Sequence, residues 1–168
     1  MNNQTCCFTG HRSIPENDKE SLQKRLEDEI INLIHQDVRY FGAGGALGFD
    51  TMAALTVLKL KGEFPDIRLI LVLPCKGQTR SWSDKNKKIY DQILSQADKT
   101  VYTSENYYSG CMQKRDRWLI EGSDICICYQ TANIGGTAYT VNYARRMGRR
   151  IIGLAQGPVS MPATARGL

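Results

Sequence analysis

Hydrophobic residues along this chain form short runs, which alternate with longer segments where they recur every three or four positions. The short runs predict strands at residues 5–9, 38–41, 68–73, 99–103, 125–129 and 149–154. The periodic segments predict helices at residues 17–35, 52–60, 83–97, 111–121 and 137–148. Because strands and helices alternate throughout, we expect an α/β fold. It should be a three-layer α/β/α sandwich around a mostly parallel sheet of about six strands.

Two of the expected helix starts carry residues that are suited to capping. Asn17 is the expected N-cap of the first helix, with Glu20 at the matching position three residues later. Asp50 or Thr51 is the expected cap of the second helix. These residues set where we expect the two helices to begin.

The length of 168 residues suits one domain with a sizeable core. We expect that domain to span residues 1–155. Residues 156–168 form an irregular tail that is rich in glycine, proline and alanine and has no periodicity. Such a tail has little structure of its own, so we expect a partner subunit or a neighbouring molecule to hold it. On this reasoning the chain forms a homo-oligomer.

Charge and hydropathy narrow the classes of partner. The net charge is +5 and the isoelectric point is near 8.9, which suits anionic ligands without requiring nucleic acid. The basic residues are dispersed rather than gathered into one block, so a nucleic-acid partner is not favoured. The longest apolar run, at 69–74, is too short to span a bilayer. No targeting signal is evident, so we expect no membrane partner and a cytoplasmic location.

The six cysteines do not predict a metal centre. Cys126 and Cys128 form the one closely spaced CxC pair, and no second pair completes a zinc site. Most of the cysteines lie in apolar runs, where the thiol behaves as a small hydrophobic group. We therefore expect reduced, mostly buried thiols and no bound metal.

Glycines gather with polar residues just after three of the predicted strands. The carboxyl ends of parallel strands are where open α/β sheets bind ligands, and glycine lets backbone N–H groups approach a phosphate or sugar closely. The candidate ligand-binding residues in these three segments are Gly10, His11, Arg12, Gly44, Gly45, Gly48, Asp50, Gly135, Gly136 and Thr137. A tight turn without a ligand is the alternative for each segment taken alone.

Further candidates lie outside the glycine segments. Arg115 stands between apolar neighbours on its helix, where a buried guanidinium needs a partner. Arg115 and Asp116 either contact the ligand or form an internal ion pair that ties the helix to the glycine loops. The remaining candidates are Lys76 and Gln78 at the rim of the site, and Trp82 and Tyr107 for stacking on a base, with ordinary packing as the alternative.

Several nucleotide and hydrolase motifs are absent from the sequence. No GxxxxGK[ST] phosphate loop occurs, and no GxSxG nucleophile elbow occurs. The strand after the glycine-rich segment ends in Leu71-Val72-Leu73-Pro74 and lacks the acidic residue of a dinucleotide fingerprint. Hydride transfer with a nicotinamide cofactor is therefore not expected, and no motif identifies another cofactor.

Four motifs together resemble one superfamily. They are Thr9-Gly10-His11-Arg12, Gly44-Gly45-Ala46-x-Gly48-x-Asp50, Lys114-Arg115-Asp116 before Ser123-Asp124, and Gly135-Gly136-Thr137. In this order they resemble the SLOG superfamily, which groups the DNA-uptake protein DprA/Smf with the Lonely-Guy phosphoribohydrolases. The start of the chain looks most like the YpsA-like branch. The resemblance spans residues 5–154 and implies a Rossmann-like fold that binds a nucleotide or a nucleotide-derived ligand.

The chain also departs from the better-known members of this superfamily. The Lonely-Guy motif resembles PGGxGTxxE, whose glutamate helps to cleave the N-glycosidic bond, whereas residues 134–148 here contain no glutamate. We also expect no added winged-helix domain of the DprA kind. These departures favour a nucleotide-binding protein, acting as a sensor. The alternatives are a nucleotide N-glycoside hydrolase, with Asp50 and Asp116 as candidate carboxylates, and a single-stranded nucleic-acid binding module.

Within such a site, the position of the phosphate follows from charge. Asp50 lies at the start of its helix and repels a second anion there. The helix that begins near Thr137 has no acidic residue in its first turn. We therefore expect the phosphate at Gly135-Gly136-Thr137 with Arg12 opposite, and the sugar or base near Asp50.

Overall fold

The computed structural model describes residues 4–156 of the chain. Within this range, six strands form one sheet with the order β4-β3-β2-β1-β5-β6, and every neighbouring pair is parallel. The strands are β1 (Thr5–Gly10), β2 (Tyr40–Ala43), β3 (Arg68–Leu73), β4 (Lys99–Tyr102), β5 (Ile125–Tyr129) and β6 (Arg150–Gly153). The predicted α/β fold with a parallel six-stranded sheet is confirmed.

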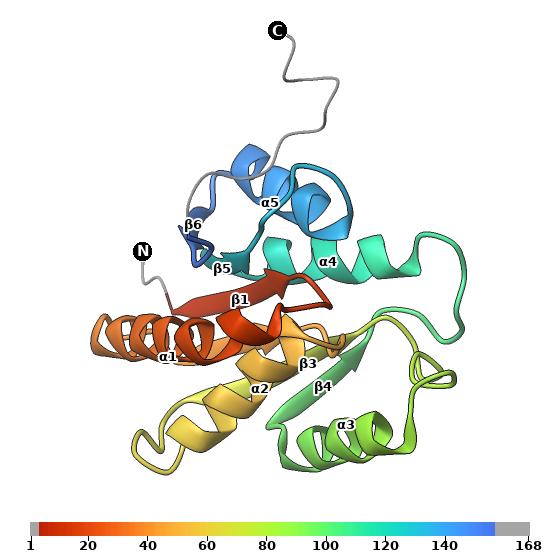
Figure 1. The fold of residues 1–168 in the computed structure, drawn as a ribbon, viewed down its shortest axis with the longest axis horizontal. Helices are drawn as coiled ribbons and strands as arrows, with labels where there is room; N and C mark the ends of the chain where they lie inside the picture. Colours follow the sequence, from red (N-terminus) through yellow and green to blue (C-terminus); the bar gives the residue numbers. More distant parts are fainter. Residues whose placement is uncertain (1–3, 157–168) are drawn as a thin grey trace, which may run out of the picture.

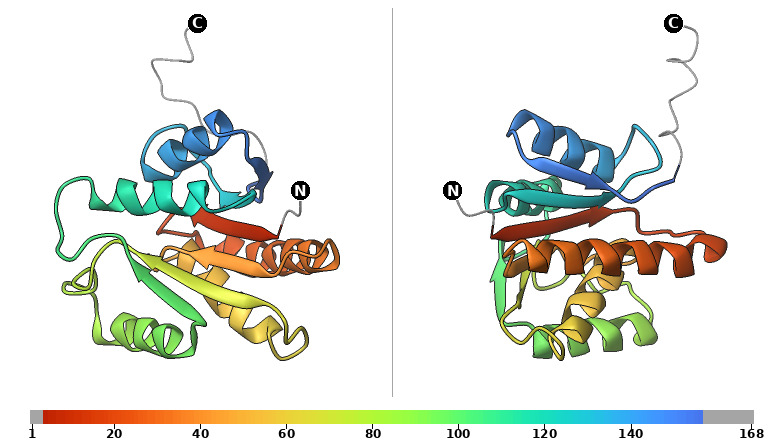
Figure 2. Two further views of the ribbon diagram at one scale, coloured as in Figure 1. Left: turned by 180° about the vertical axis from the view of Figure 1, so that it is seen from behind. Right: turned by 90° about the vertical axis from the view of Figure 1, so that its left-hand side faces the viewer.

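Helices cover both faces of the sheet (Figures 1 and 2). In the described range they are α1 (Lys19–His35), α2 (Phe49–Leu60), α3 (Asp84–Gln96), α4 (Cys111–Glu121) and α5 (Gly136–Arg146), with a short 3-10 turn η1 (Glu16–Asp18). Helices α1, α2 and α3 lie on one face, and α4 and α5 lie on the other. The result is the expected three-layer sandwich.

Two details of the predicted helix starts are wrong. Helix α1 begins at Lys19, after η1, with Asp18 as an N-cap that makes no side-chain hydrogen bond. Helix α2 begins at Phe49, with Gly48 as its N-cap. Asp50 therefore lies inside the first turn of α2, and its carboxylate is free to turn back toward the glycine loop.

The connection between strands creates a crevice beside β1. The chain first builds the sheet outward from β1 to β4, and then returns to place β5 on the other side of β1. The segment after β1 leads to one face of the sheet, whereas the segment after β5 leads to the opposite face (Figure 1). Strand exits that diverge in this way leave a crevice at their carboxyl ends, the usual ligand position in open α/β sheets.

Aromatic packing fixes the floor of this crevice. Phe8 on β1 stacks on Phe41 of β2, with ring centroids 6.1 Å apart. Phe49, at the start of α2, stacks on Tyr129 at the end of β5, with centroids 6.0 Å apart. All four rings are buried. Burying an aromatic side chain stabilises a fold by about 1.5–3 kcal/mol, so this cluster holds the ends of β1, β5 and α2 together.

Three further expectations concern the C-terminal tail, membrane-spanning helices and the cysteines. Residues 157–168, most of the predicted tail, lie outside the described residues, and the homo-oligomer stays a prediction. No helix in the described part of the chain has the length and apolar character needed to cross a membrane. All six cysteines are buried and unpaired by disulfides.

Candidate functional site

A cleft of about 250 Å³ lies at the carboxyl ends of β1 and β5. Its walls come from the end of β1, the glycine loop before α2, the first turns of α4 and the start of α5. The predicted candidates that line it are Gly10, His11, Arg12, Asp50, Arg115, Asp116, Gly135, Gly136 and Thr137. Three of the four sequence motifs therefore meet around one space, and the fourth contributes Asp50.

The glycines of the site fall into two groups by their surroundings. A Cβ atom would lie within 3 Å of neighbouring atoms at Gly10, Gly44, Gly45 and Gly48. At Gly135 and Gly136, nothing lies within 4 Å of such an atom. The first group therefore serves close internal packing, whereas the second faces open space at the cleft.

His11 links the exits of the two central strands. Its Nε2 accepts a hydrogen bond of 2.8 Å from the backbone N–H of Thr131, just after β5. Its ring also lies edge-on to Tyr129, with centroids 5.7 Å apart. Burial lowers the pKa of His11, so the imidazole is neutral at pH 7 with Nε2 as the acceptor. His11 thus makes a contact that shapes the loops at the two strand exits.

The glycine loop between β2 and α2 uses its polar groups internally. The backbone N–H of Ala46 donates to Oδ2 of Asp50 over 3.2 Å. The hydroxyl of Thr51 donates to the Ala46 carbonyl over 2.9 Å. The N–H of Phe49, at the start of α2, donates to the carbonyl of His11 over 3.1 Å. Two backbone donors of this loop, the N–H groups of Ala46 and Phe49, are therefore not available to an anion.

Asp50 is a buried carboxyl group at the edge of the cleft. Its side chain is 7% exposed. Burial raises the pKa of Asp50 to about 6, and the nearby Asp116 carboxylate adds to the rise, whereas Arg115 and the Ala46 N–H oppose it. A carboxyl group of this pKa exchanges its proton near neutral pH, which is the range in which a general acid works best.

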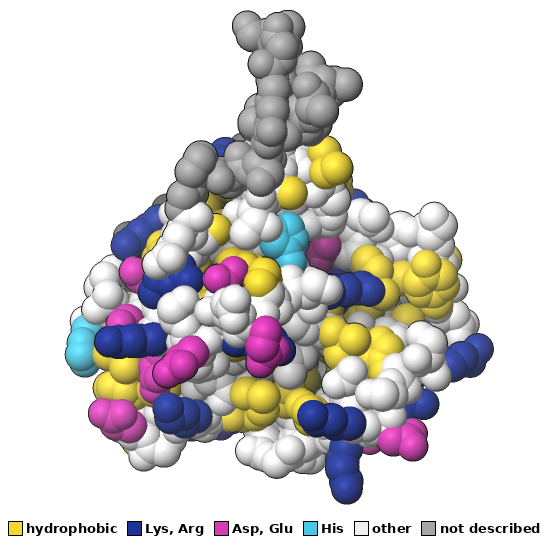
Figure 3. All heavy atoms as spheres, viewed as in Figure 1, with side chains coloured by type: hydrophobic (Ala, Val, Ile, Leu, Met, Phe, Trp, Pro, Cys, Tyr) yellow, Lys and Arg dark blue, Asp and Glu magenta, His cyan; other side chains and the backbone are white. Residues whose placement is uncertain are grey.

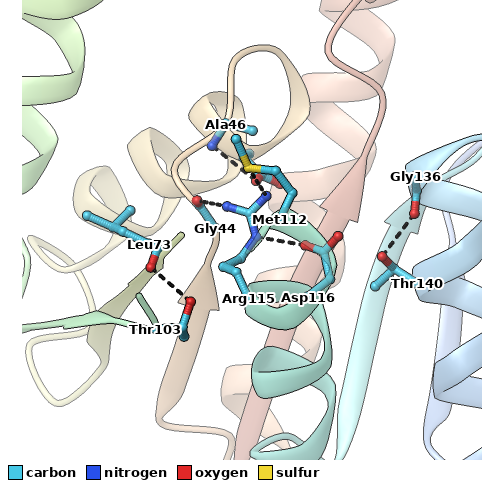
Figure 4. Close-up of polar contacts among 10 residues, drawn as sticks. Gly44, Ala46, Leu73, Thr103, Met112, Arg115, Asp116, Gly136 and Thr140 are labelled. Atoms are coloured by element: carbon cyan, nitrogen blue, oxygen red, sulfur yellow. Dashed lines mark hydrogen bonds and ion pairs between the residues drawn. The ribbon is translucent and has the colours of Figure 1, made fainter. Parts of the chain in front are cut away.

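Arg115 forms the internal connection that the sequence left open (Figure 4). Its guanidinium is nearly buried; Nε donates to Oδ1 of Asp116 over 2.7 Å, and a second nitrogen donates to the carbonyl of Gly44. A Cβ atom on Gly44 would lie 2.8 Å from that guanidinium. A buried Arg with two acceptors is satisfied, so Arg115 ties α4 to the glycine loop.

The start of α5 has the opposite character from the start of α2. Gly135 is its N-cap and makes no side-chain capping bond, and the first turn holds no acidic residue. Gly135 and Gly136 are exposed, while Thr137 is buried at the cleft wall. Backbone N–H groups in a first helical turn have no partner within the helix, and the helix dipole makes this end positive. This is an arrangement that can accept an anion.

Arg12 supplies a cation to the same cleft. Its side chain is exposed, and its guanidinium makes no hydrogen bond or ion pair with the rest of the described chain. Its positive charge lowers the pKa of Asp50 slightly against the larger effect of burial. A Cβ atom on Gly48 would lie 2.2 Å from the backbone carbonyl oxygen of Arg12. The position of Arg12 thus depends on a glycine in the neighbouring loop.

Some cleft residues were not predicted from the sequence. Met112 and Gln113 line it from α4, one turn before Arg115, and Ile134 lines it from the loop before α5. Helical spacing from Arg115 could have indicated Met112, whereas nothing in the sequence distinguishes Ile134. Lys76, Gln78, Trp82 and Tyr107 do not line this cleft and lie along an adjoining groove. Within the described residues, no group of His, Cys, Asp and Glu side chains is arranged to hold a metal ion.

The parallel sheet and the cleft at the carboxyl ends of its strands define a Rossmann-like α/β protein with a candidate ligand site. The sequence profile of the YpsA family, described as the YspA SLOG family, matches residues 6–151, so the chain belongs to this family. Relatives include a UPF0398 protein of Bacillus licheniformis, 29% identical over 128 residues, which cover 74% of this chain and 70% of the relative. A UPF0398 protein of Halalkalibacterium halodurans is 30% identical over 128 residues, which cover 74% of this chain and 68% of the relative.

Two solved structures with the same fold are DNA processing proteins. One is DNA processing protein A from Helicobacter pylori, described for its single-stranded DNA binding mode, with a TM-score of 0.68 and 19% identity. The match covers 98% of this chain and 71% of that one. DprA from Streptococcus pneumoniae gives a TM-score of 0.64 at 18% identity, covering 89% of this chain and 49% of that one. At these identities the likeness establishes the fold.

Proposed function

We propose that this protein binds a nucleotide or a nucleotide-derived ligand in the cleft, and that it acts as a sensor of that ligand. The observation that carries the proposal is the uncapped start of α5, which lines the same cleft as the exposed Arg12. The phosphate lies on the N–H groups of Gly136 and its neighbours, and Arg12 pairs with its charge. The sugar or base then extends toward Asp50.

The surrounding contacts support this division of the site. In the loop before α2, the N–H of Ala46 is engaged by Asp50 and the N–H of Phe49 by the His11 carbonyl. The Asp50 carboxylate also repels an anion there, so the start of α5 is the better anion site. Hydrogen bonds to charged groups contribute about 1.5–3 kcal/mol each. Two or three of them, less the cost of association, give a dissociation constant in the micromolar range.

The test is calorimetric titration with AMP, using a matched pair of variants. Gly136→Glu places a carboxylate at the exposed start of α5, and Gly136→Gln adds the same bulk without charge. We expect micromolar binding by the unchanged protein, about tenfold weaker binding by Gly136→Gln and at least about a hundredfold loss in Gly136→Glu. Gly136 is a better position than the buried Thr137, where a glutamate would also disturb packing. Equal AMP affinity in all three proteins would overturn the proposal.

A hydrolase is the second candidate, and Asp50 is the observation that favours it. A cleft carboxyl group whose pKa is about 6 can protonate the leaving base during cleavage of an N-glycosidic bond. Release of free adenine from AMP, lost in Asp50→Asn, would establish this activity. Without adenine release the protein is a binder.

A single-stranded nucleic-acid module is the third candidate. It is favoured by the likeness in fold to a protein described for single-stranded DNA binding. Binding to an oligonucleotide in the absence of any AMP binding would support it in place of the nucleotide proposal.

A further inference from the structure

A second hollow adjoins the cleft. This groove, of about 1000 Å³, lies between the loop that follows β3 and the loop that precedes α4. Both loops lie on the right-hand side of Figure 1, and Figure 3 shows hydrophobic and basic side chains close together on that side. Arg12 and Met112 line both the groove and the cleft. A ligand can therefore extend from the cleft into the groove past Arg12.

The charge of the groove suits a phosphate chain. Arg12, Lys76 and Arg80 line it and are exposed, against the single carboxylate of Glu105 among its described lining residues. The Nζ atom of Lys76 lies 5.7 Å from the centre of the Tyr102 ring, which limits the positions that this ammonium group samples. Three cations that line one groove attract a ligand that carries more than one negative charge.

Aromatic side chains line the same groove as these cations. The Trp82 ring is half-buried and packs edge-on against Tyr90, with centroids 5.5 Å apart, so its position is fixed. Tyr107 is 68% exposed, the most exposed of the large hydrophobic residues in the described chain. Rings next to cations are the arrangement that stacks bases while holding the phosphates between them.

The sizes of the two hollows favour a ligand that occupies both. The cleft, at about 250 Å³, is below the ~300–1,000 Å³ typical of small-molecule sites. It suits a phosphate with its sugar. A mononucleotide bound there would leave the cations and rings of the groove without a partner.

From these observations we infer that the ligand is a compact dinucleotide, two nucleoside units joined through phosphate. One unit lies in the cleft, the linking phosphates pass Arg12, and the second base stacks on Tyr107 in the groove. This inference rests on the proposed nucleotide function and adds the class of ligand to it. The same chemistry is present in a single strand of nucleic acid, so the experiment includes that source.

The test compares AMP, diadenosine pyrophosphate and a ten-residue oligodeoxyadenylate by calorimetry. The first two share one base, so their difference measures the second unit. We expect the dinucleotide to bind the full chain about tenfold or more tightly than AMP. Tyr107→Ala and Arg80→Ala should reduce dinucleotide affinity to that of AMP and leave AMP affinity unchanged. Tyr108→Ala, an equally large change at a neighbouring exposed tyrosine outside the groove, should change neither.

The other possible results distinguish failure of the dinucleotide inference from failure of the proposed nucleotide-binding function. If AMP and the dinucleotide bind equally, or if Tyr107→Ala has no effect, the groove is no part of the site and the inference is overturned while the proposed function stands. If the oligonucleotide binds more tightly than the dinucleotide through Tyr107, the groove is the path of a single strand and the compact ligand is overturned. If neither AMP nor the dinucleotide binds, both the function and the inference fail.

Discussion

At the scale of single residues, the buried group formed by Asp50, Arg115 and Asp116 determines the chemistry of the cleft wall. One guanidinium serves two carboxyl groups, and it makes its direct ion pair with Asp116. When Asp50 takes up a proton, only the ion pair of Arg115 and Asp116 remains charged, and its two charges cancel. Burial disfavours the charged form of Asp50, and the Asp116 carboxylate adds to this effect, so the pKa of Asp50 is raised to about 6 despite the neighbouring arginine.

The raised pKa predicts how stability depends on pH. The pKa of Asp50 lies above its ordinary value of 3.8, so the folded state binds this proton more tightly than the unfolded state does. The contribution of Asp50 to the free energy of unfolding therefore falls as pH rises from about 4 to about 6. Asp50→Asn removes this titration. A pKa raised by about two units corresponds to about 3 kcal/mol. The free energy of unfolding of Asp50→Asn, relative to that of the unchanged protein, should therefore rise by about this amount between pH 4 and pH 8. Urea unfolding at the two pH values measures the change.

Asp98 provides the matched control for this measurement. Burial opposes the shift, but hydrogen bonds from Lys61 and from the N–H of Leu69 lower the pKa of Asp98. Its contribution to stability is present at neutral pH and is lost as pH falls. Asp98→Asn should therefore lose stability relative to the unchanged protein as pH rises from about 2 to about 4, with the opposite sign to Asp50→Asn and at lower pH, because the folded pKa of Asp98 lies below 3.8. If Asp50→Asn instead loses unfolding free energy relative to the unchanged protein, and the loss grows with pH, the prediction is contradicted. Asp50 would then be ionised and stabilised by Arg115.

At the scale of elements, the two glycine-containing loops have different tasks. The loop before α2 is built for close packing: at Gly48, where φ is +77°, a Cβ would lie 2.2 Å from the Arg12 carbonyl. The loop before α5 is open at Gly136, whose backbone is not in the left-handed region and whose Cβ would meet nothing within 4 Å. A substitution should therefore affect stability in the first loop and binding in the second.

Alanine at these two glycines tests that division. Gly48→Ala should lower the free energy of unfolding by at least about 1–2 kcal/mol, because the left-handed conformation and the contact with Arg12 both oppose a side chain. Gly136→Ala should keep or slightly raise stability, since alanine is a better helix former than glycine, yet weaken AMP binding several-fold. Urea unfolding and calorimetry on the same two variants measure both effects. Reduced AMP binding without loss of stability in Gly48→Ala would contradict the division.

The elements themselves could be predicted from the sequence to a large extent. The aliphatic runs at 68–73 and 125–129 coincide with β3 and β5, because a strand buried on both faces needs a continuous apolar run. The start of α1 could not be predicted, because η1 replaces the expected cap at Asn17 with an extra turn. The loop segments at strand exits could be found because parallel strands bring their carboxyl ends to one edge.

What the sequence could not supply are contacts between distant segments. Arg115 donates to the carbonyl of Gly44, 71 residues earlier, and the sequence left this tie and ligand contact as equal alternatives. The hydrogen bond between His11 and Thr131 spans 120 residues. Both depend on strand order, which places β5 beside β1, and no local pattern determines that order. Arg80 and Glu105 were also missed, since each is an ordinary charged residue in its own loop.

At the scale of the whole molecule, the cleft lies where the two halves of the sheet meet. One half consists of β1 to β4 with α1, α2 and α3, and the other consists of β5 and β6 with α5. The aromatic contact between Phe49 and Tyr129 and the hydrogen bond between His11 and Thr131 already join the halves. A ligand that contacts both Arg12 and the start of α5 adds a further connection across the same boundary.

Hydrogen exchange measures this connection directly. At an AMP concentration a hundred times the dissociation constant, binding should raise the free energy of unfolding by about 2.7 kcal/mol and the melting temperature by about 5–10 °C. Amide protection should increase together at residues 10–12 and 134–138, which lie on opposite sides of the boundary, and less at 44–50, where the N–H groups of Ala46 and Phe49 are already engaged. In Gly136→Glu, with at least hundredfold weaker binding, the same AMP concentration should raise the melting temperature by no more than about 1–2 °C and should increase protection far less. Protection confined to one half would mean that the ligand does not bridge the two strand exits, and would place the anion away from Arg12.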